Sequence, residues 1–238
     1  MDTVETLLDS QLEHDFHRVR TMALRNVILG LFRRRPATLL PFTAVKGRLH
    51  MRAQRDLGIR SVPLDQIVGS EGRFGEFDRA FNPRSRRLID RWKRIGRARH
   101  YGEHLPPVEL FKVGDIYFVR DGNHRLSVAR ALGQTELDAH VVEIETNVPL
   151  PADLDEAELE RKAAQSRFVE EIGLLQVRPG AIVPREASDP GTYEALRRQI
   201  DCHQQELARE QGRVVSRAEA VLARVRVAPR AMSHTMLK

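Results

Sequence analysis

Apolar residues recur at helical spacing along the first quarter of the chain. Between residues 3 and 32 they return every three or four positions with polar residues between them, which predicts one long amphipathic helix. Pro36 ends any helix there, and residues 43–57 repeat the pattern ahead of Gly58, so we expect a second helix. The expected inward positions are Leu7, Leu8, Leu12, Phe16, Val19, Ala23, Val27 and Leu31, then Val45, Leu49, Ala53 and Leu57.

The middle of the chain alternates short β-branched and aromatic runs with helical patterns. We expect strands at residues 62–67, 108–113, 116–119 and 137–144. A basic helix falls between the first two of them, and a short helix follows the third and ends near Gly133. This order predicts an α/β (α+β) fold with a small mixed sheet, flanked by helical extensions at both ends.

The last third of the chain reads as helical additions. Helices are expected at residues 154–172 and 193–211, each followed by a glycine, and a final helix should reach about residue 225. Ser216 and Glu219 fit a capping box at the start of the final helix. We expect the last two helices to form a hairpin that packs on the core; a DNA-binding helix-turn-helix is the alternative. A disordered tail is expected over residues 229–238.

The turn between the third strand and its helix is the strongest candidate site. Gly122 lets the backbone approach a ligand, and the first N–H groups of the following helix, with their partial positive charge, would face an anion. His124 and Arg125 are cations in a first helical turn, where they oppose the helix dipole, and a bound phosphate would explain them. The alternative is an ordinary Asp-Gly turn with solvated side chains.

The loop and the order of elements resemble the ParB/sulfiredoxin-like domain superfamily over residues 59–146. Gly122, His124 and Arg125 match the Gly-Cys-His-Arg loop of sulfiredoxins, while only Gly122 and Arg125 match the Gly-Glu-Arg-Arg loop of ParB proteins. The resemblance implies an ATP- or CTP-like nucleotide, with or without magnesium, held through its phosphates by Gly122, Asn123, His124 and Arg125. Asn123 stands where sulfiredoxins carry their cysteine nucleophile, which excludes sulfinic acid reduction.

With this resemblance, the chain divides into four expected segments. Residues 1–58 form an N-terminal helical extension, residues 59–150 the ParB/sulfiredoxin-like phosphate-binding domain, residues 151–228 a C-terminal helical region, and residues 229–238 the tail.

Positive charge is concentrated in the basic helix. The chain has a formal net charge of +6 and a pI near 10.0, and residues 84–99 hold eight Lys or Arg against one Asp. Leu88, Trp92 and Ile95 mark its buried face. Such a helix suits DNA or another polyanion, and a merely solvated face is the alternative. The candidate nucleic-acid contacts are Arg84, Arg87, Arg91 and Arg94.

Carboxylates near the predicted phosphate loop suggest chemistry as well as binding. The resemblance extends to free-serine kinases, which implies a catalytic acidic residue in the glycine-spaced loop at residues 69–78. Glu71 is the first choice for a general base, and Asp121 for a contact to a metal or a hydroxyl group. Solvated turn residues are the alternative. We expect no structural metal site.

Composition limits the class of protein. The chain has 238 residues, 41% of them hydrophobic, one cysteine and no apolar run long enough for a membrane helix, so we expect a cytoplasmic protein without a membrane partner. We expect a nucleotide-responsive regulator associated with DNA or another polyanion, and a homodimer is plausible. The alternatives are a small-molecule kinase or nucleotide hydrolase that uses the same loop, and a non-catalytic scaffold.

Overall fold

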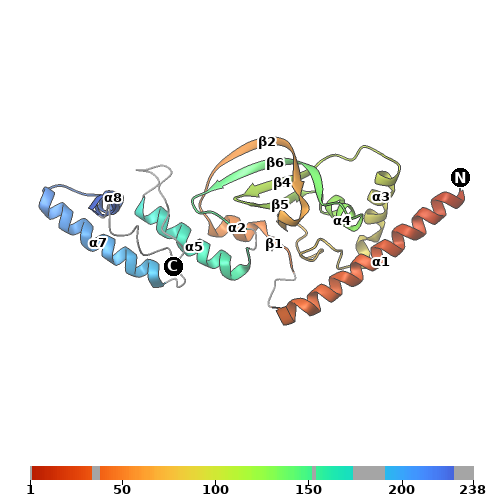
Figure 1. Ribbon diagram of the computed structural model, residues 1–238, viewed down its shortest axis with the longest axis horizontal. Helices are drawn as coiled ribbons and strands as arrows, with labels where there is room; N and C mark the ends of the chain where they lie inside the picture. The colour runs from red at the N-terminus through yellow and green to blue at the C-terminus, as the bar shows by residue number, and fades with distance from the viewer. Residues whose placement is uncertain (1, 34–37, 152–153, 174–190, 228–238) are drawn as a thin grey trace, which may run out of the picture. The chain divides into compact units, whose positions relative to one another are not determined.

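The chain forms a mixed sheet accompanied by helices, as predicted, and the sheet has six strands (Figure 1). The structure is a computed structural model, and it describes residues 2–33, 38–151, 154–173 and 191–227. Contacts divide the chain into two compact units, residues 1–47 with 51–156, and residues 48–50 with 157–238. Among the described helices, none combines the length and the apolar character needed to cross a membrane.

The sheet belongs to the first unit and has the order β1-β3-β5-β4-β6-β2. β1 pairs parallel with β3, β3 with β5, and β4 with β6, whereas β4 with β5 and β2 with β6 are antiparallel. β5 lies near the centre, and Ile116 and Phe118 of β5 and Val113 of β4 are completely buried. The strands are β1 (Leu40–Pro41), β2 (Met51–Pro63), β3 (Ile67–Ser70), β4 (Val108–Val113), β5 (Ile116–Asp121) and β6 (Glu136–Thr146).

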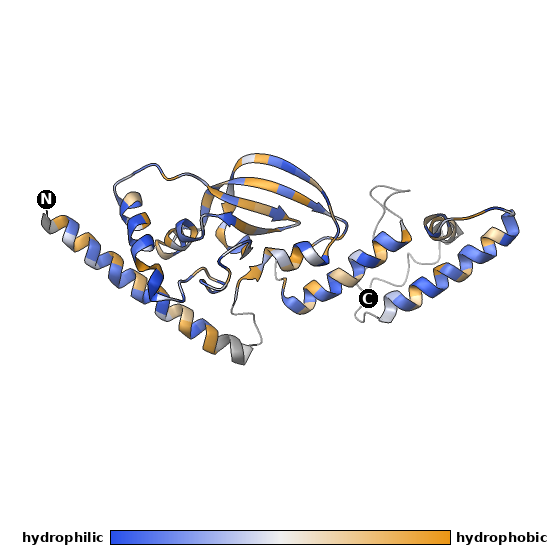
Figure 2. Cartoon of the chain, turned by 180° about the vertical axis from the view of Figure 1, so that it is seen from behind, coloured by the Kyte–Doolittle hydropathy of each residue, from blue (hydrophilic) through white to orange (hydrophobic). Residues whose placement is uncertain are grey.

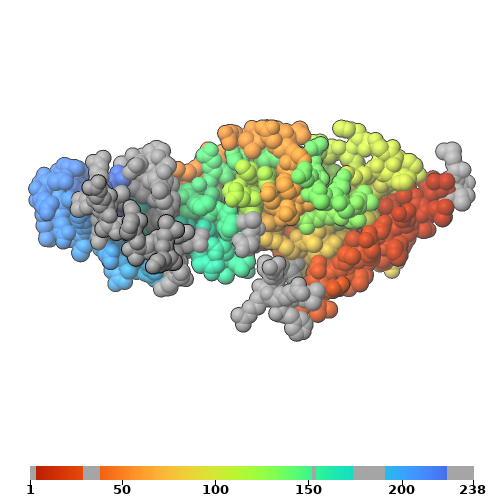
Figure 3. All heavy atoms as spheres, viewed as in Figure 1, coloured from red at the N-terminus to blue at the C-terminus, as the bar shows by residue number. Residues whose placement is uncertain are grey.

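Four helices accompany the sheet: α1 (Asp2–Arg33), α2 (Phe42–Arg48), α3 (Ile89–His100) and α4 (Asn123–Ala131). The long N-terminal helix is confirmed, and its apolar positions, orange in Figure 2, alternate with polar ones. α1 packs against α3, and in Figure 3 the atoms of α1, in red, touch the rest of the sheet-containing unit. Phe16 packs edge-on against Trp92 with ring centroids 5.7 Å apart. Short 3-10 turns cover Leu64–Gln66 (η1) and Arg86–Leu88 (η2).

Two sequence predictions are wrong between residues 43 and 67. The expected helix at residues 43–57 stops at Arg48, and β2 begins at Met51 and pairs with β6 along its length. Ala53 is exposed, and Gly58 takes φ +68° at an irregularity within the strand instead of ending a helix. The expected strand at residues 62–67 is in fact the end of β2, the turn η1 and the start of β3. Long-range pairing with β6 supplies backbone partners that local spacing does not reveal.

The second unit contains α5 (Glu156–Ile172), α7 (Gly191–Gln211) and α8 (Arg217–Val227). Its small core joins Phe168, Ile172 and Tyr193 to half-buried apolar residues of all three helices. The capping box is confirmed: the Ser216 N–H donates to the Glu219 carboxylate (2.9 Å), and the Glu219 N–H donates to Ser216 Oγ (3.2 Å). The predicted tail lies outside the described residues.

Candidate functional site

Two parallel strands end together at the edge of the sheet where the predicted phosphate loop lies. β3 and β5 run in the same direction, with Ser70 opposite Val119. The Ser70 hydroxyl donates to the Val119 carbonyl (3.1 Å), and the Glu71 N–H donates to the same oxygen (2.9 Å). The loop after β3 is therefore fixed beside the turn from β5 into α4. From the sequence, this proximity could be predicted only through the family resemblance.

Gly122 makes the turn from β5 into α4. Its φ of 108° and ψ of 20° lie in the left-handed region, and it is the N-cap residue of α4 without any side chain to cap the helix. A Cβ atom here would lie 3.0 Å from both Arg125 Nε and Val108 Cγ2. The first intrahelical bond runs from the Leu126 N–H to the Gly122 carbonyl (2.9 Å). The N–H groups of residues 123–125 precede this bond, which is the usual geometry of an anion site at a helix N-terminus.

The first two side chains of α4 are buried and polar. Asn123 is 6% exposed and His124 is 3% exposed. Asn123 Oδ1 and both ring nitrogens of His124 find no hydrogen-bond partner among the described residues. The His124 ring stands edge-on to Phe77, with ring centroids 5.2 Å apart. Buried polar atoms without partners are uncommon and destabilising, so we expect this cluster to bind a ligand.

Three arginines act on His124, and one of them, Arg73, is itself paired with Glu76 at 2.9 Å. Burial is the main cause that lowers the pKa of His124 to about 4, and the nearby Arg91, Arg73 and Arg94 lower it further. No carboxylate acts on this imidazole in the opposite direction. His124 is consequently neutral at pH 7, and a bound anion would be attracted by the guanidinium groups of Arg91 and Arg94, which are unpaired among the described residues.

The basic helix α3 has two different charged faces. Lys93 lies 2.5 Å from Asp9 of α1, and Arg97 lies 2.8 Å from the same carboxylate, so this face is neutralised by α1. The predicted nucleic-acid contacts are on other surfaces: Arg84, Arg87, Arg91 and Arg94 are exposed and form no ion pair with any described residue.

α3 is also fixed to α4. Trp92 Nε1 donates to Ser127 Oγ (3.1 Å), and both side chains are buried. Since Arg91 and Arg94 act on His124, the structure brings together two sites that the sequence treated separately. Arg84 and Arg87 are not among the groups that act on His124.

Arg125 is bound within the protein and does not present a free fork for phosphate. Its Nη2 lies 2.6 Å from Asp121 Oδ2, and its Nη1 donates to the carbonyl oxygens of Pro106 (2.5 Å) and Pro107 (3.2 Å). The guanidinium therefore fixes the segment before β4 to the start of α4. Asp121, the candidate contact to a metal or hydroxyl, is mostly exposed and is paired with Arg125.

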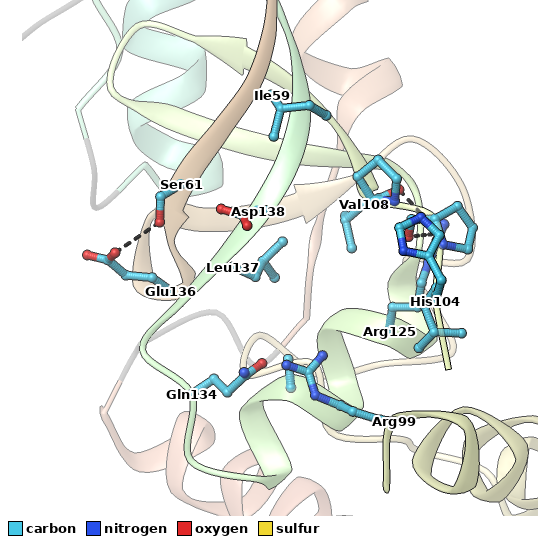
Figure 4. A pocket seen from close by; sticks show the side chains of 14 residues that line it. Ile59, Ser61, Arg99, His104, Val108, Arg125, Gln134, Glu136, Leu137 and Asp138 are labelled. Atoms are coloured by element: carbon cyan, nitrogen blue, oxygen red, sulfur yellow. Dashed lines mark hydrogen bonds between the residues drawn. The ribbon is translucent and has the colours of Figure 1, made fainter. Parts of the chain in front are cut away.

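A cavity of about 560 Å³ lies along the Arg125 side of α4 (Figure 4). Val108, His104 and Arg125 lie on one side of it and Gln134 and Glu136 on the other, with Leu137 between them. Ser61 Oγ donates to Glu136 at the rim (3.0 Å). The cavity has the size of small-molecule sites and combines apolar walls with a few polar groups.

The three carboxylates of the loop after β3 differ in their surroundings. Asp78 is fully buried and accepts hydrogen bonds from the backbone of Ala80 and Asn82 and from the side chains of Asn26 and Asn82. Glu76 pairs with Arg73 at 2.9 Å. Glu71, the candidate base, is exposed, and its carboxylate forms no hydrogen bond or ion pair within the described part of the chain.

Sequence reasoning missed Arg73 as a site residue. It has a left-handed backbone (φ 55°), which is uncommon for a residue other than glycine and occurs often at functional sites. Its position among Gly69, Gly72 and Gly75 was the available signal.

The described residues contain no group of three His, Cys, Asp or Glu side chains that could hold a metal ion. Comparisons with protein-family models, curated proteins and solved structures find no match.

Proposed function

We propose that the sheet-containing unit binds a phosphate-bearing ligand, an ATP- or CTP-like nucleotide, at the N-terminus of α4. The observation that carries this proposal is the buried His124 ring at the start of α4, whose nitrogens have no partner among the described residues and on which the unpaired Arg91 and Arg94 act. A phosphate would accept from the first N–H groups of α4 and neutralise the surrounding guanidinium groups. Whether magnesium accompanies the phosphates is decided by the titration described below.

The proposed roles of the loop residues follow from their contacts. Asn123 and His124 bind the ligand, and Arg91, Arg94 and Arg73 supply charge from neighbouring elements. Arg125 is a positioning residue, because its bonds fix the segment before β4 against the turn. The adjacent cavity of about 560 Å³ offers room for the body of the ligand.

The protein would act as a ligand-responsive regulator in the cytoplasm that associates with DNA or another polyanion. The unpaired arginines of η2 and α3 support this part of the proposal, since phosphate backbones bind such surfaces. Ligand binding would hold α3 and α4 in one arrangement, because Trp92 joins these helices and the ligand would contact both.

Calorimetric titration of the full chain with nucleoside di- and triphosphates, with and without magnesium, tests the proposal. The Arg91→Gln/Arg94→Gln variant should bind at least about tenfold more weakly, because charge-assisted hydrogen bonds contribute roughly 1.5–3 kcal/mol each. Arg86→Gln/Arg87→Gln is the matched control, since it removes the same charge and both arginines are exposed on η2 and do not act on His124. If folded wild-type protein binds no nucleotide, the proposal fails and the scaffold alternative stands.

A kinase or hydrolase remains the second candidate, favoured by the unpaired Glu71 carboxylate beside the end of β5. In that case Glu71→Gln should abolish turnover of the bound nucleotide and leave its affinity within about twofold, because the general base is lost and the phosphate contacts are kept. Phosphate release and calorimetry measure the two quantities. Turnover retained by the variant would remove Glu71 as the base.

A further inference from the structure

A second cavity, of about 580 Å³, lies at the opposite end of α4 from the proposed phosphate site. α1 contributes one wall, residues 80 and 82 another, and the last residues of α4 with Gly133 the third. Arg18, Arg25 and Arg130 line it, and no carboxylate does. The proposed function does not involve any of these three arginines.

The three arginines retain capacity for a ligand. Arg25 is exposed and forms no hydrogen bond or ion pair with the described residues. Arg18 uses only Nη2, which lies 3.0 Å from Asp15 Oδ1 and 3.5 Å from the Ala131 carbonyl. Arg130 is largely buried; its Nη2 donates to the backbone carbonyls of Leu64 and Ile67, while its Nε has no partner in the described structure. Donors remain available from at least two guanidinium groups.

The negative groups near the cavity have hydrogen-bond partners of their own. Asp78, behind the cavity wall, accepts from the side-chain amides of Asn26 and Asn82 at 3.0 Å each. The negative end of the α4 dipole is also capped: Gln134 and Gly133 donate to the Ala129 and Arg130 carbonyls, and Arg18 donates to Ala131. Arg18 is paired with Asp15, and Asp78 and Asp65 act on Arg130, so Arg25 is the lining arginine that has no anionic partner among the described residues.

The cavity also has an apolar part. Val19, Met22, Ala80 and Ala131 line it together with the arginines. Apolar walls with a few converging cations suit a small organic anion better than a nucleic-acid backbone, which requires an open surface.

We propose that this cavity is a second ligand site, for a small anion with two or more negative charges, either a phosphate compound or a polycarboxylate. Because α1 and α4 both line the cavity, an anion there would hold the C-terminal half of α1 against the sheet-containing unit. The site is independent of the proposed nucleotide site, which uses the other end of the helix.

Calorimetry with inorganic pyrophosphate and with citrate tests this site, using full-length Arg91→Gln/Arg94→Gln protein so that the first site is weakened in advance. Adding Arg18→Gln and Arg25→Gln should weaken binding at least about tenfold, and because both arginines are exposed these changes leave the fold intact. The control variant carries Arg52→Gln and Arg60→Gln instead. These changes remove the same charge from exposed positions of β2 and should leave the affinity for both anions unchanged.

Binding of pyrophosphate alone, citrate alone or both, each lost with Arg18 and Arg25, supports the site and identifies its ligand class. Absence of binding to either anion, or equal losses in the two sets of variants, overturns it. Neither result alters the nucleotide titration of wild-type protein, so the two proposals succeed or fail separately.

Discussion

His124 connects the candidate site to the pH dependence of stability. Its folded-state pKa of about 4 lies below the value of 6.5 expected when unfolded, so the unfolded chain binds the proton more readily. The neutral imidazole therefore contributes stability that is present above pH 6.5 and is lost as the pH falls toward 4. From pH 7 to pH 5 we expect a loss of about 2 kcal/mol in the free energy of unfolding from this group.

Urea unfolding at pH 7 and pH 5 measures this effect, followed by the fluorescence of Trp92, the single tryptophan, which is buried against α4. His124→Gln should show a smaller decrease between the two pH values, because the amide does not titrate. Equal decreases in both proteins would mean that His124 titrates normally in the folded state.

At the level of single residues, the sequence located the candidate site but not its contacts. Gly122 lies at the strand-to-helix turn, as predicted, and Asn123 and His124 follow in the first turn of α4. Spacing along the chain could not show that Arg125 is bound to Asp121 and two carbonyl groups, or that Arg73 comes near His124. These contacts depend on the parallel pairing of β3 with β5 and on the packing of α3, which are long-range features.

Among the elements, α4 begins and ends at glycines with positive φ, and the two positions differ in their surroundings. A Cβ at Gly122 would meet Arg125 and Val108 at 3.0 Å, whereas a Cβ at Gly133 would meet nothing within 4 Å. Gly133→Ala should therefore cost only the left-handed strain, about 1 kcal/mol, and Gly122→Ala should cost more because Arg125 must also move. Chemical unfolding of the two variants gives the difference, and equal costs would show that the Arg125 contact is unimportant.

Helices were predicted better than the strands that precede the site. α1, α4 and α5 carry strong periodic patterns or glycine ends, and each forms close to its expected position, whereas α3 begins at Ile89, five residues later than expected, after the 3-10 turn η2. The start of β2 was mistaken for a continuation of α2 because Ala53 and Leu57 continue the four-residue spacing of Val45 and Leu49, while the exposed side chains of β2 hide the strand pattern. Only its pairing with β6 distinguishes the two structures, and that partner lies about eighty residues away along the chain.

For the whole molecule, the shared use of Arg91 and Arg94 predicts competition between ligands. If these arginines serve both the nucleotide and a duplex, saturating nucleotide should weaken duplex binding, and duplex should weaken nucleotide binding by the same factor. Arg84→Gln/Arg87→Gln should reduce only duplex affinity, since neither residue acts on His124, and it should lower the dependence of log K on log salt by up to about 2. Fluorescence anisotropy of a labelled duplex over a range of salt concentrations, with and without nucleotide, measures both effects. If the duplex affinity stays the same or rises when nucleotide is added, α3 does not bind both ligands. The nucleotide site and the polyanion-binding surface would then be separate.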